Sequence, residues 1–314
     1  MIQLTQVTKS YSGVKAVDDV TLSIPSGQIL GFLGPNGAGK TTCMRMITCY
    51  MPPTAGKIQV DGLDTIEQSL EVRRKIGYLP EMAPVYQDIN VVDYLNYVCD
   101  LRKIAADKRR QRIRGIIERC GLEDVLHKDV GQLSKGYRQR VGLAQAMVHD
   151  PDIVVLDEPT AGLDPNQIAE IRTLIKELGR QKTVILSTHI LSEVQATCSR
   201  IVIINQGRIV ADDTPEGLQA NAEGRGVFIA AVKTGAPDVA AKTRQIAGVE
   251  DARAVSTSHG VQKLRIESGA GRDVREDFFR LAVRENWVIL EMAQESRSLE
   301  DVFRNLTRED QLHG

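Results

Sequence analysis

Apolar and polar positions alternate in short runs over residues 1–33 of the chain. The runs cover residues 2–7, 14–24 and 28–33, and turn-forming residues at 12–13 and 25–27 separate them. Alternation with a period of two, bounded by glycine and proline, is typical of β-strands. We therefore expect the chain to open with a strand-rich region.

The spacing of apolar positions becomes helical further along the chain. Val91, Leu95, Val98 and Leu101 lie three or four positions apart, and a basic stretch follows through residue 119. Because this spacing places the apolar side chains on one face of a helix, it predicts a helical insert over residues 91–120.

Apolar runs and helical segments then alternate. Strands are predicted at residues 153–156, 183–186 and 201–204, with helices at 166–178 and after His189. Strands buried on both faces read as continuous apolar runs, and crossover helices connect them in parallel sheets. This region therefore predicts a parallel α/β sheet.

Turn-forming and helix-breaking residues at 221–226 mark a boundary between residues 1–220 and a tail over residues 221–314. The tail is predicted to form a strand, a helix, two strands, a helix, a strand and a last helix, at 226–233, 237–247, 249–256, 261–267, 273–285, 287–293 and 298–308. That order, βαββαβ plus a helix, is the ferredoxin-like split βαβ arrangement.

The composition is that of a globular protein. The 314 residues carry 40 Lys and Arg against 41 Asp and Glu, a formal net charge of -1, with 42% hydrophobic and 26% charged residues. These values exclude a disordered or collagen-like chain. Since no excess of positive charge is present, we expect no nucleic-acid partner.

The sequence also bears on location. Its apolar runs are far shorter than the roughly 18 residues of a membrane span, and residues 1–10 lack the features of a signal peptide. Five cysteines are present, without a CxxC pair. We therefore expect a cytosolic chain with reduced, mostly structural thiols rather than disulfides or a zinc site.

Residues 34–41 fit the phosphate-loop pattern G-x-x-x-x-G-K-[ST], between the predicted strand at 28–33 and a helix-compatible run at 42–50. The glycines let the backbone aim N–H groups at phosphate oxygens, and the helix N-terminus adds partial positive charge. Lys40 supplies a full charge and Thr41 a hydroxyl for Mg²⁺. The candidate nucleotide-binding residues are Gly34, Pro35, Asn36, Gly37, Ala38, Gly39, Lys40, Thr41 and Thr42.

The residues at the loop and at the strand end each have an alternative interpretation. A dinucleotide loop needs a third glycine where Thr42 stands, so the pattern favours a mononucleotide. Asp157 and Glu158 end the apolar run that begins at residue 153, and such a pair is in itself a common strand terminus. Beside a phosphate loop, Asp157 is predicted to hold Mg²⁺ and Glu158 to polarise the attacking water.

Residues 133–140, Leu-Ser-Lys-Gly-Tyr-Arg-Gln-Arg, resemble the signature motif of ABC transporter ATPases. Other landmarks of that family appear in its usual order, and the resemblance covers residues 1 to about 220. It implies an adenine-stacking role for Tyr11, a lid-loop position for Glu81, an interface role for Asp164 and a γ-phosphate contact for His189.

The resemblance departs from the common pattern at three positions. Lys135 and Tyr137 stand where many members have Gly and Gln. Glu81 stands where an amide is usual; its carboxylate remains a candidate ligand for Mg²⁺ or water but brings a charge.

The resemblance implies an α/β fold: a P-loop NTPase (ABC ATPase) core with an antiparallel β subdomain and a helical subdomain at about 85–150, plus a small C-terminal α+β ferredoxin-like domain. In this family two subunits pack head to tail, so that Ser134 and Gly136 of one would close over the nucleotide of the other. A second ATPase subunit is thus implied, most simply a second copy. ATP and Mg²⁺ are the implied cofactors. The implied catalytic residues are Lys40, Glu158 and His189, and the implied metal ligands are Thr41, Glu81 and Asp157.

The last predicted helix, with the sequence Ser-Leu-Glu-Asp-Val-Phe-Arg-Asn-Leu-Thr at 298–307, resembles the end of ATPase subunits from exporters of the antibiotic-export and gliding-motility type. This implies a subunit that powers a separate integral-membrane permease, most often in export. Such a chain would be peripheral on the inner face of the cell membrane, held there through its permease.

Each landmark residue also has an ordinary structural interpretation. Tyr11 can be a strand-end aromatic, His189 a structural histidine, and Asp164 the cap of a helix that begins near Pro165. The basic stretch at 102–119 is most simply a solvated helix face, with contact to anionic lipid or a membrane subunit as the alternative.

Two other functions fit part of the pattern. A soluble ABC ATPase acting on ribosomes or DNA would usually carry two cassettes or long coiled coils, and neither is evident. A P-loop small-molecule kinase would lack the motif at 133–140. The sequence therefore favours the transport ATPase.

Overall fold

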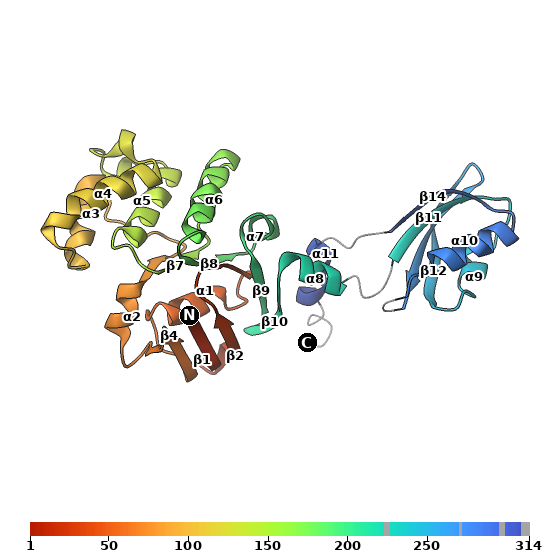
Figure 1. Ribbon diagram of the computed structural model, residues 1–314, viewed down its shortest axis with the longest axis horizontal. Coiled ribbons are helices and arrows are strands. Elements are labelled where there is room, and N and C mark those ends of the chain that lie inside the picture. Colours follow the sequence, from red (N-terminus) through yellow and green to blue (C-terminus); the bar gives the residue numbers. More distant parts are fainter. Residues whose placement is uncertain (223–226, 270–271, 295–298, 309–314) are drawn as a thin grey trace. The chain divides into compact units, whose positions relative to one another are not determined.

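The computed structural model describes residues 1–222, 227–269, 272–294 and 299–308. Most of the predicted boundary at 221–226 lies outside these residues, as does residue 298 at the start of the last predicted helix. The chain divides into two compact units, Met1–Pro215 with the end of the chain from Leu306, and Glu216–Asn305. Figure 1 shows the elements of both units.

The first sheet of the first unit is antiparallel. Its strands are β1 (Ile2–Tyr11), β2 (Val14–Ile24), β4 (Ala55–Val60) and β5 (Leu63–Asp64), in the order β2-β1-β4-β5. The predicted strand-rich opening is confirmed, and β1 is longer than the run at 2–7. Alternate side chains of β1 and β2 are buried, because one face of this sheet packs on the core.

The second sheet has six strands in the order β10-β9-β3-β8-β7-β6. Its strands are β3 (Ile29–Leu33), β6 (Ile76–Leu79), β7 (Ile153–Asp157), β8 (Thr183–Thr188), β9 (Arg200–Asn205) and β10 (Arg208–Asp213). Neighbouring strands from β9 to β6 run parallel, and β10 pairs antiparallel at the edge. The predicted parallel sheet is confirmed, and its carboxyl edge is where ligands bind in folds of this kind.

Helices cover both faces of this six-stranded sheet (Figure 1). The helix α1 (Lys40–Ile47) lies between the two sheets, where Met44 and Ile47 share one core with residues of both. On the other face lie α6 (Pro165–Gly179) and α7 (Leu191–Thr197), which contact β8 and β3. The phosphate loop and the strand ends are therefore fixed from both sides.

The predicted helical insert is divided into separate helices. They are α3 (Val91–Leu101), α4 (Ala106–Cys120) and α5 (Lys135–Met147), with 3₁₀ turns at Glu123–Val125 and Val130–Gln132 and a short preceding helix α2 (Ser69–Lys75). The insert expected over 91–120 forms two helices, α3 and α4, because Lys103 takes a left-handed conformation, φ 55°, between them. A non-glycine residue in that region ends a right-handed helix.

The second unit is a four-stranded antiparallel sheet with helices. Its bounds, Glu216 and Asn305, fall inside the first and last helices of this part of the chain. The elements are α8 (Pro215–Ala222), β11 (Val227–Lys233), α9 (Val239–Thr243), β12 (Val249–Ser258), β13 (Val261–Ser268), α10 (Arg275–Arg284), β14 (Val288–Gln294) and α11 (Leu299–Arg308). The strand order β12-β13-β11-β14 is the split βαβ arrangement expected from the sequence. Phe278 of α10 packs edge-to-face on Phe228 of β11 in its core.

The five cysteines are free, as predicted, and most are buried. They are Cys43, Cys49, Cys99, Cys120 and Cys198. Burial raises the pKa of the Cys43, Cys120 and Cys198 thiols to about 12, and that of the half-buried Cys49 thiol to about 11.

Among the described helices none combines the length and the apolar character needed to cross a bilayer.

Acid is expected to destabilise the protein through His149. Burial, together with the nearby Arg102, lowers the pKa of His149 from 6.5 to about 4, and its Nε2 lies 3.2 Å from the carbonyl oxygen of Ile76. Between these two pKa values the unfolded chain binds a proton that the folded chain does not, so stability falls as the pH drops below 6.5. We expect a loss of about 2 kcal/mol in the free energy of unfolding between pH 7.5 and 5.

This expectation is checked by urea denaturation of the wild type and of His149→Gln, whose amide can still reach the Ile76 carbonyl. The variant lacks the titrating group, so its unfolding free energy should fall less over the same pH range. Parallel pH profiles for the two proteins would contradict it.

Candidate functional site

The phosphate loop lies between β3 and α1, as the sequence predicts. Gly37 and Gly39 have positive φ angles of 81° and 107°. A Cβ added at Gly39 would lie 2.5 Å from the carbonyl oxygen of Ala16, so a side chain fits there neither in space nor in backbone conformation. The chain can therefore turn directly from the strand into α1, whose first residue is Lys40.

Lys40 is a buried cation held by its own loop. Its side chain is 6% exposed, and Nζ donates hydrogen bonds to the carbonyl oxygens of Gly34 at 2.8 Å and Pro35 at 3.2 Å. The same Nζ lies 3.6 Å from Oε1 of Glu158. A buried ammonium with three donors placed inside such a loop is suited to phosphate oxygens.

A cavity of about 480 Å³ opens over this loop. Its lining brings together nine of the residues predicted from the sequence, with Ala16 and Ala161 in addition. The nine are Asn36, Gly37, Gly39, Lys40, Thr41, Thr42, Glu81, Glu158 and His189. The predicted loop residues outside this lining are close by, since Gly34 and Pro35 bind Lys40 and Ala38 is buried.

Glu158 and His189 meet at the carboxyl ends of neighbouring parallel strands. Glu158 directly follows β7 with φ 49°, and its N–H donates to the carbonyl oxygen of Ser187 on β8 at 2.9 Å. Nδ1 of His189 donates to both oxygens of the Glu158 carboxylate, at 2.9 and 3.0 Å. Because a carboxylate only accepts, the His189 proton is on Nδ1. The pair is arranged to hold a carboxylate base in a fixed orientation.

Asp157 lies one residue earlier and is fully buried. Ser187, its register partner on β8, donates from Oγ to Asp157 Oδ1 at 2.6 Å. Within the described part of the chain, Asp157 Oδ2 is buried without a hydrogen-bond partner. An orphaned carboxylate oxygen, one residue before Glu158 in the lining of a phosphate cavity that Thr41 also lines, fits Mg²⁺ or one of its water ligands.

Ser187 was missed by the sequence reasoning. The predicted strand at 183–186 stopped one residue short of it, and its place opposite Asp157 depends on the register between β7 and β8. Once two parallel strands are known to be neighbours, the last residue of each is a candidate for the same site.

Comparison with known proteins assigns the family. The family model described as ABC transporter matches residues 17–161. The ABC transporter ATP-binding protein NatA of Bacillus subtilis is 40% identical over 224 residues, 69% of this chain and 91% of NatA. The daunorubicin resistance ATP-binding protein DrrA3 of Streptomyces coeruleorubidus is 31% identical over 305 residues, 96% of this chain and 94% of DrrA3.

This chain belongs to the ABC transporter ATP-binding proteins. Among solved structures it resembles MJ0796, a bacterial ABC transporter cassette solved as a dimer, with a TM-score of 0.64, 28% identity, and coverage of 68% of this chain and 98% of that one. The fold is that of an ABC ATPase cassette, and the chain is an ATP-binding ATPase subunit. The kinase interpretation is thereby excluded, and nothing in the comparisons supports a soluble ribosome- or DNA-directed ATPase.

The signature residues of this ABC subunit lie outside the cavity lining. Ser134 caps α5, with its Oγ accepting from the Tyr137 N–H at 3.4 Å. Asp164 caps α6, accepting from two backbone N–H groups at 3.0 Å, so its predicted capping role is real. A Cβ added at Gly136 would lie 2.6 Å from the Gln167 side chain, which shows how closely the first turn of α5 approaches α6.

Tyr11 lies at the end of β1 and is likewise not in the cavity lining. The residue is 44% exposed, its hydroxyl donates to Sδ of Met51 at 2.8 Å, and the Lys9 ammonium lies 5.5 Å from the ring centroid. An exposed aromatic face with a neighbouring cation is available for stacking.

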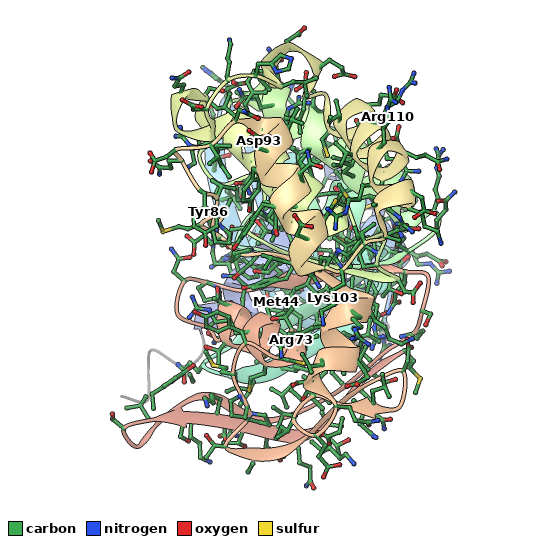
Figure 2. The ribbon with its side chains drawn as sticks, turned by 90° about the vertical axis from the view of Figure 1, so that its left-hand side faces the viewer. Met44, Arg73, Tyr86, Asp93, Lys103 and Arg110 are labelled. Carbon is green, nitrogen blue, oxygen red and sulfur yellow. The ribbon has the colours of Figure 1, made fainter. Side chains whose placement is uncertain are left out.

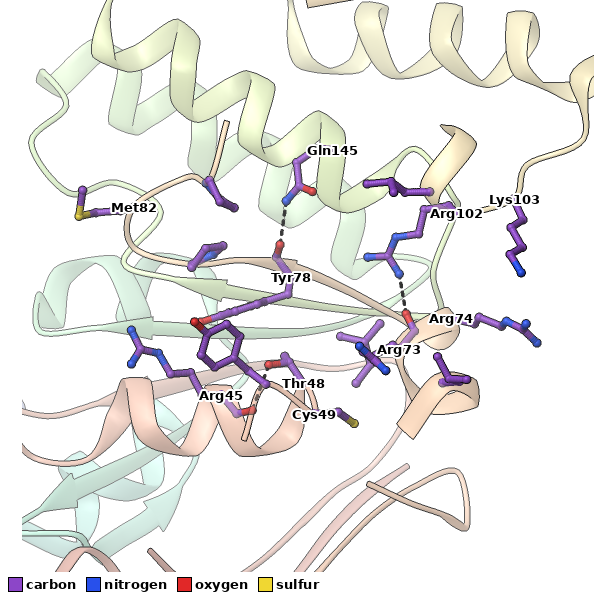
Figure 3. Close-up of a pocket in the computed structure, with 16 residues that line it drawn as sticks. Arg45, Thr48, Cys49, Arg73, Arg74, Tyr78, Met82, Arg102, Lys103 and Gln145 are labelled. Carbon is purple, nitrogen blue, oxygen red and sulfur yellow. Dashed lines mark hydrogen bonds between the residues drawn. The ribbon is translucent and has the colours of Figure 1, made fainter. Parts of the chain in front are cut away.

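The ABC subunit has a second hollow, of about 690 Å³. Figure 2 labels two residues of its lining, Arg73 and Lys103. Its described lining holds five cations and no carboxylate, together with exposed apolar side chains. These are Arg45, Arg73, Arg74, Arg102 and Lys103, with Tyr50, Leu70, Met82 and Leu101. Four cations gather at one end, where Arg102 Nη1 donates to the Arg73 carbonyl oxygen at 2.7 Å, and Arg45 lies at the other (Figure 3).

Proposed function

We propose that two copies of this chain bind two MgATP between them, hydrolyse them and power a separate membrane permease in export. The observation that carries the proposal is the cavity that joins the phosphate loop to Glu158 and His189. DrrA3, named for daunorubicin resistance, matches over both units of the chain, which supports export as the direction. The second unit, predicted over residues 221–314, is proposed to be an accessory domain of this exporter type.

In this proposal the loop residues and Lys40 hold the phosphates. Thr41 and Asp157 hold Mg²⁺, which would neutralise phosphate charge when bound. Glu158 accepts a proton from the attacking water, and His189 keeps the Glu158 carboxylate oriented while contacting the γ-phosphate. The support is geometric, since Glu158 lies within reach of both Lys40 and His189.

Further roles depend on the second copy. Ser134 and Gly136 are proposed to close over the phosphates bound by the partner subunit, with Asp164 at the interface between the two. The dimeric cassette of MJ0796 supports this arrangement. Tyr11 is proposed to stack on adenine, and Glu81 to contact Mg²⁺ or its water, because it lines the cavity.

The second hollow is proposed to receive a cytoplasmic segment of the permease. Five cations without a carboxylate favour a segment with acidic side chains, and the exposed Met82 and Leu101 favour apolar ones as well. Attachment through the permease would place the chain at the inner face of the cell membrane.

The proposal predicts that a membrane protein accompanies the chain in its ATP-bound state. A tagged Glu158→Gln variant is purified from native membranes with ATP and Mg²⁺, and the proteins that accompany it are identified by mass spectrometry. We expect one protein with several membrane-spanning segments, retained in proportion to the tagged chain.

Two matched variants sharpen this experiment. Adding Arg74→Glu and Lys103→Glu reverses two exposed charges of the second hollow. We expect the amount of membrane protein recovered with the tagged chain to fall at least about tenfold. Arg253→Glu reverses an exposed charge on β12 and should retain it. Recovery of ribosomal or DNA-maintenance proteins without a membrane protein would overturn the transport assignment.

A further inference from the structure

Glu193 is a buried carboxylate on α7 that the site described above does not include. Its side chain is 3% exposed. Oε1 accepts a hydrogen bond from the Thr160 hydroxyl at 2.6 Å, and Oε2 accepts one from the Thr188 hydroxyl at 2.9 Å. Both threonines are themselves buried, so the carboxylate is held by two neutral hydroxyls. Burying a carboxylate is costly unless hydrogen bonds compensate it, which makes this contact more than space filling.

The two threonines belong to the segments that carry the hydrolytic pair. Thr160 lies two residues after Glu158, and the turn between them is closed by the Ala161 N–H, which donates to the Glu158 carbonyl oxygen at 3.1 Å. Thr188 directly precedes His189, and its Oγ1 accepts from the Ile190 N–H at 3.1 Å. Glu193 therefore joins the backbone behind Glu158 to the backbone behind His189.

We propose that Glu193 is a positioning residue for ATP hydrolysis, which through Thr160 and Thr188 keeps the Glu158 carboxylate and the His189 ring in hydrogen-bonding contact. The side chains of that pair meet at 2.9 Å on the cavity side, and Glu193 links the same two segments within the protein interior. The segments follow different strands, so a link between them fixes a distance that neither strand sets alone. The inference rests on ATP hydrolysis at the proposed site.

The test separates turnover from binding in the full-length chain. Thr160→Val keeps the shape of the side chain but removes the hydroxyl, and Thr160→Ser keeps the hydroxyl. We expect kcat to fall about tenfold in Thr160→Val while the Kd for ATP stays within about twofold, because misplacing a catalytic group slows the chemical step without removing a nucleotide contact. Thr160→Ser should return kcat to within about twofold of the wild type.

A double variant tests whether the link acts as a unit. If Glu193 works by joining the two segments, Thr160→Val together with Thr188→Val should lower kcat about as much as either change alone. Glu193→Gln preserves the shape but removes the charge and places an amide NH2, which cannot accept, opposite one of the two hydroxyls, and it should give the same loss. Thr243→Val removes an equally buried hydroxyl that donates to the Val239 carbonyl oxygen in the second unit, and should leave kcat unchanged.

Three results would overturn the inference: a weaker Kd for ATP that accounts for the lower rate, a serine variant as slow as the valine variant, or strictly multiplicative losses in the double variant. The folded fraction of each variant is measured as well. If kcat falls only in proportion to the folded fraction, Glu193 stabilises the fold and does not position the catalytic pair. If the wild-type chain binds ATP without hydrolysing it, the proposed function itself is contradicted. That outcome differs from the three above, because the wild type and the variants would then show no difference in rate.

Discussion

Replacing Glu158 with glutamine is expected to lower ATP turnover by a factor of about 100 to 10,000 while ATP remains bound. The amide keeps the size of the side chain but cannot accept a proton from water. It also removes the negative charge 3.6 Å from Lys40, so the cation is more available to phosphate oxygens. Steady-state phosphate release and equilibrium ATP binding measure the two halves of this expectation.

Glu81→Gln is the matched control for this change. It makes the same chemical replacement in the same cavity and introduces the amide that is usual at this position in ABC ATPases. We expect its turnover to fall less than about tenfold, because the Glu81 carboxylate is not held against His189. Comparable losses in the two variants would show that any removal of negative charge from the cavity slows hydrolysis, against a specific role for Glu158.

Lys40→Ala is expected to weaken ATP binding about 100-fold, and with it to abolish turnover at ordinary ATP concentrations. Hydrogen bonds between charged partners contribute about 1.5–3 kcal/mol each, and Lys40 brings a charge into a loop whose other donors are backbone N–H groups. Isothermal titration with ATP measures the effect. Lys57→Ala, which removes an exposed cation from β4, should bind ATP like the wild type.

Loss of stability is the alternative explanation for a weak Lys40→Ala variant, because the change leaves the nearly buried Glu158 carboxylate without its neighbouring cation. The combined variant Lys40→Ala, Glu158→Gln removes that unpaired charge. If it recovers ATP affinity to the wild-type level, the role of Lys40 in binding phosphate is refuted.

Much of the architecture could be predicted because the pattern of residues within a strand or loop was often enough to identify it. The parallel strands at 153–156 and 183–186 are uninterrupted apolar runs, and the loop at 34–41 needs glycines at fixed positions. The strand β6, by contrast, has only four residues, Ile-Gly-Tyr-Leu, and was not predicted. So short a run gains its stability from pairing with β7, which the local pattern does not contain.

The site residues likewise divide into those that a local motif identifies and those that depend on contacts distant in the sequence. Lys40, Asp157 and Glu158 were found because each belongs to a contiguous motif. Ser187 and Glu193 were missed because their partners, Asp157 and Thr160, lie 30 and 33 positions away in the sequence. Contacts of that kind depend on strand register and on how α7 packs against the sheet, and a single sequence does not determine either.

The burial of the cysteines has a practical consequence for labelling this protein with probes of its conformation. A thiol with a pKa of about 12, such as that of Cys43 directly after the phosphate loop, is ionised in only about one molecule in 100,000 at neutral pH. Maleimides and spin labels react with thiolates that they can reach, so the four buried cysteines should react with them slowly. A cysteine introduced on the surface would therefore report subunit closure by fluorescence or electron resonance once the half-buried Cys49 is replaced, with the four buried cysteines left in place.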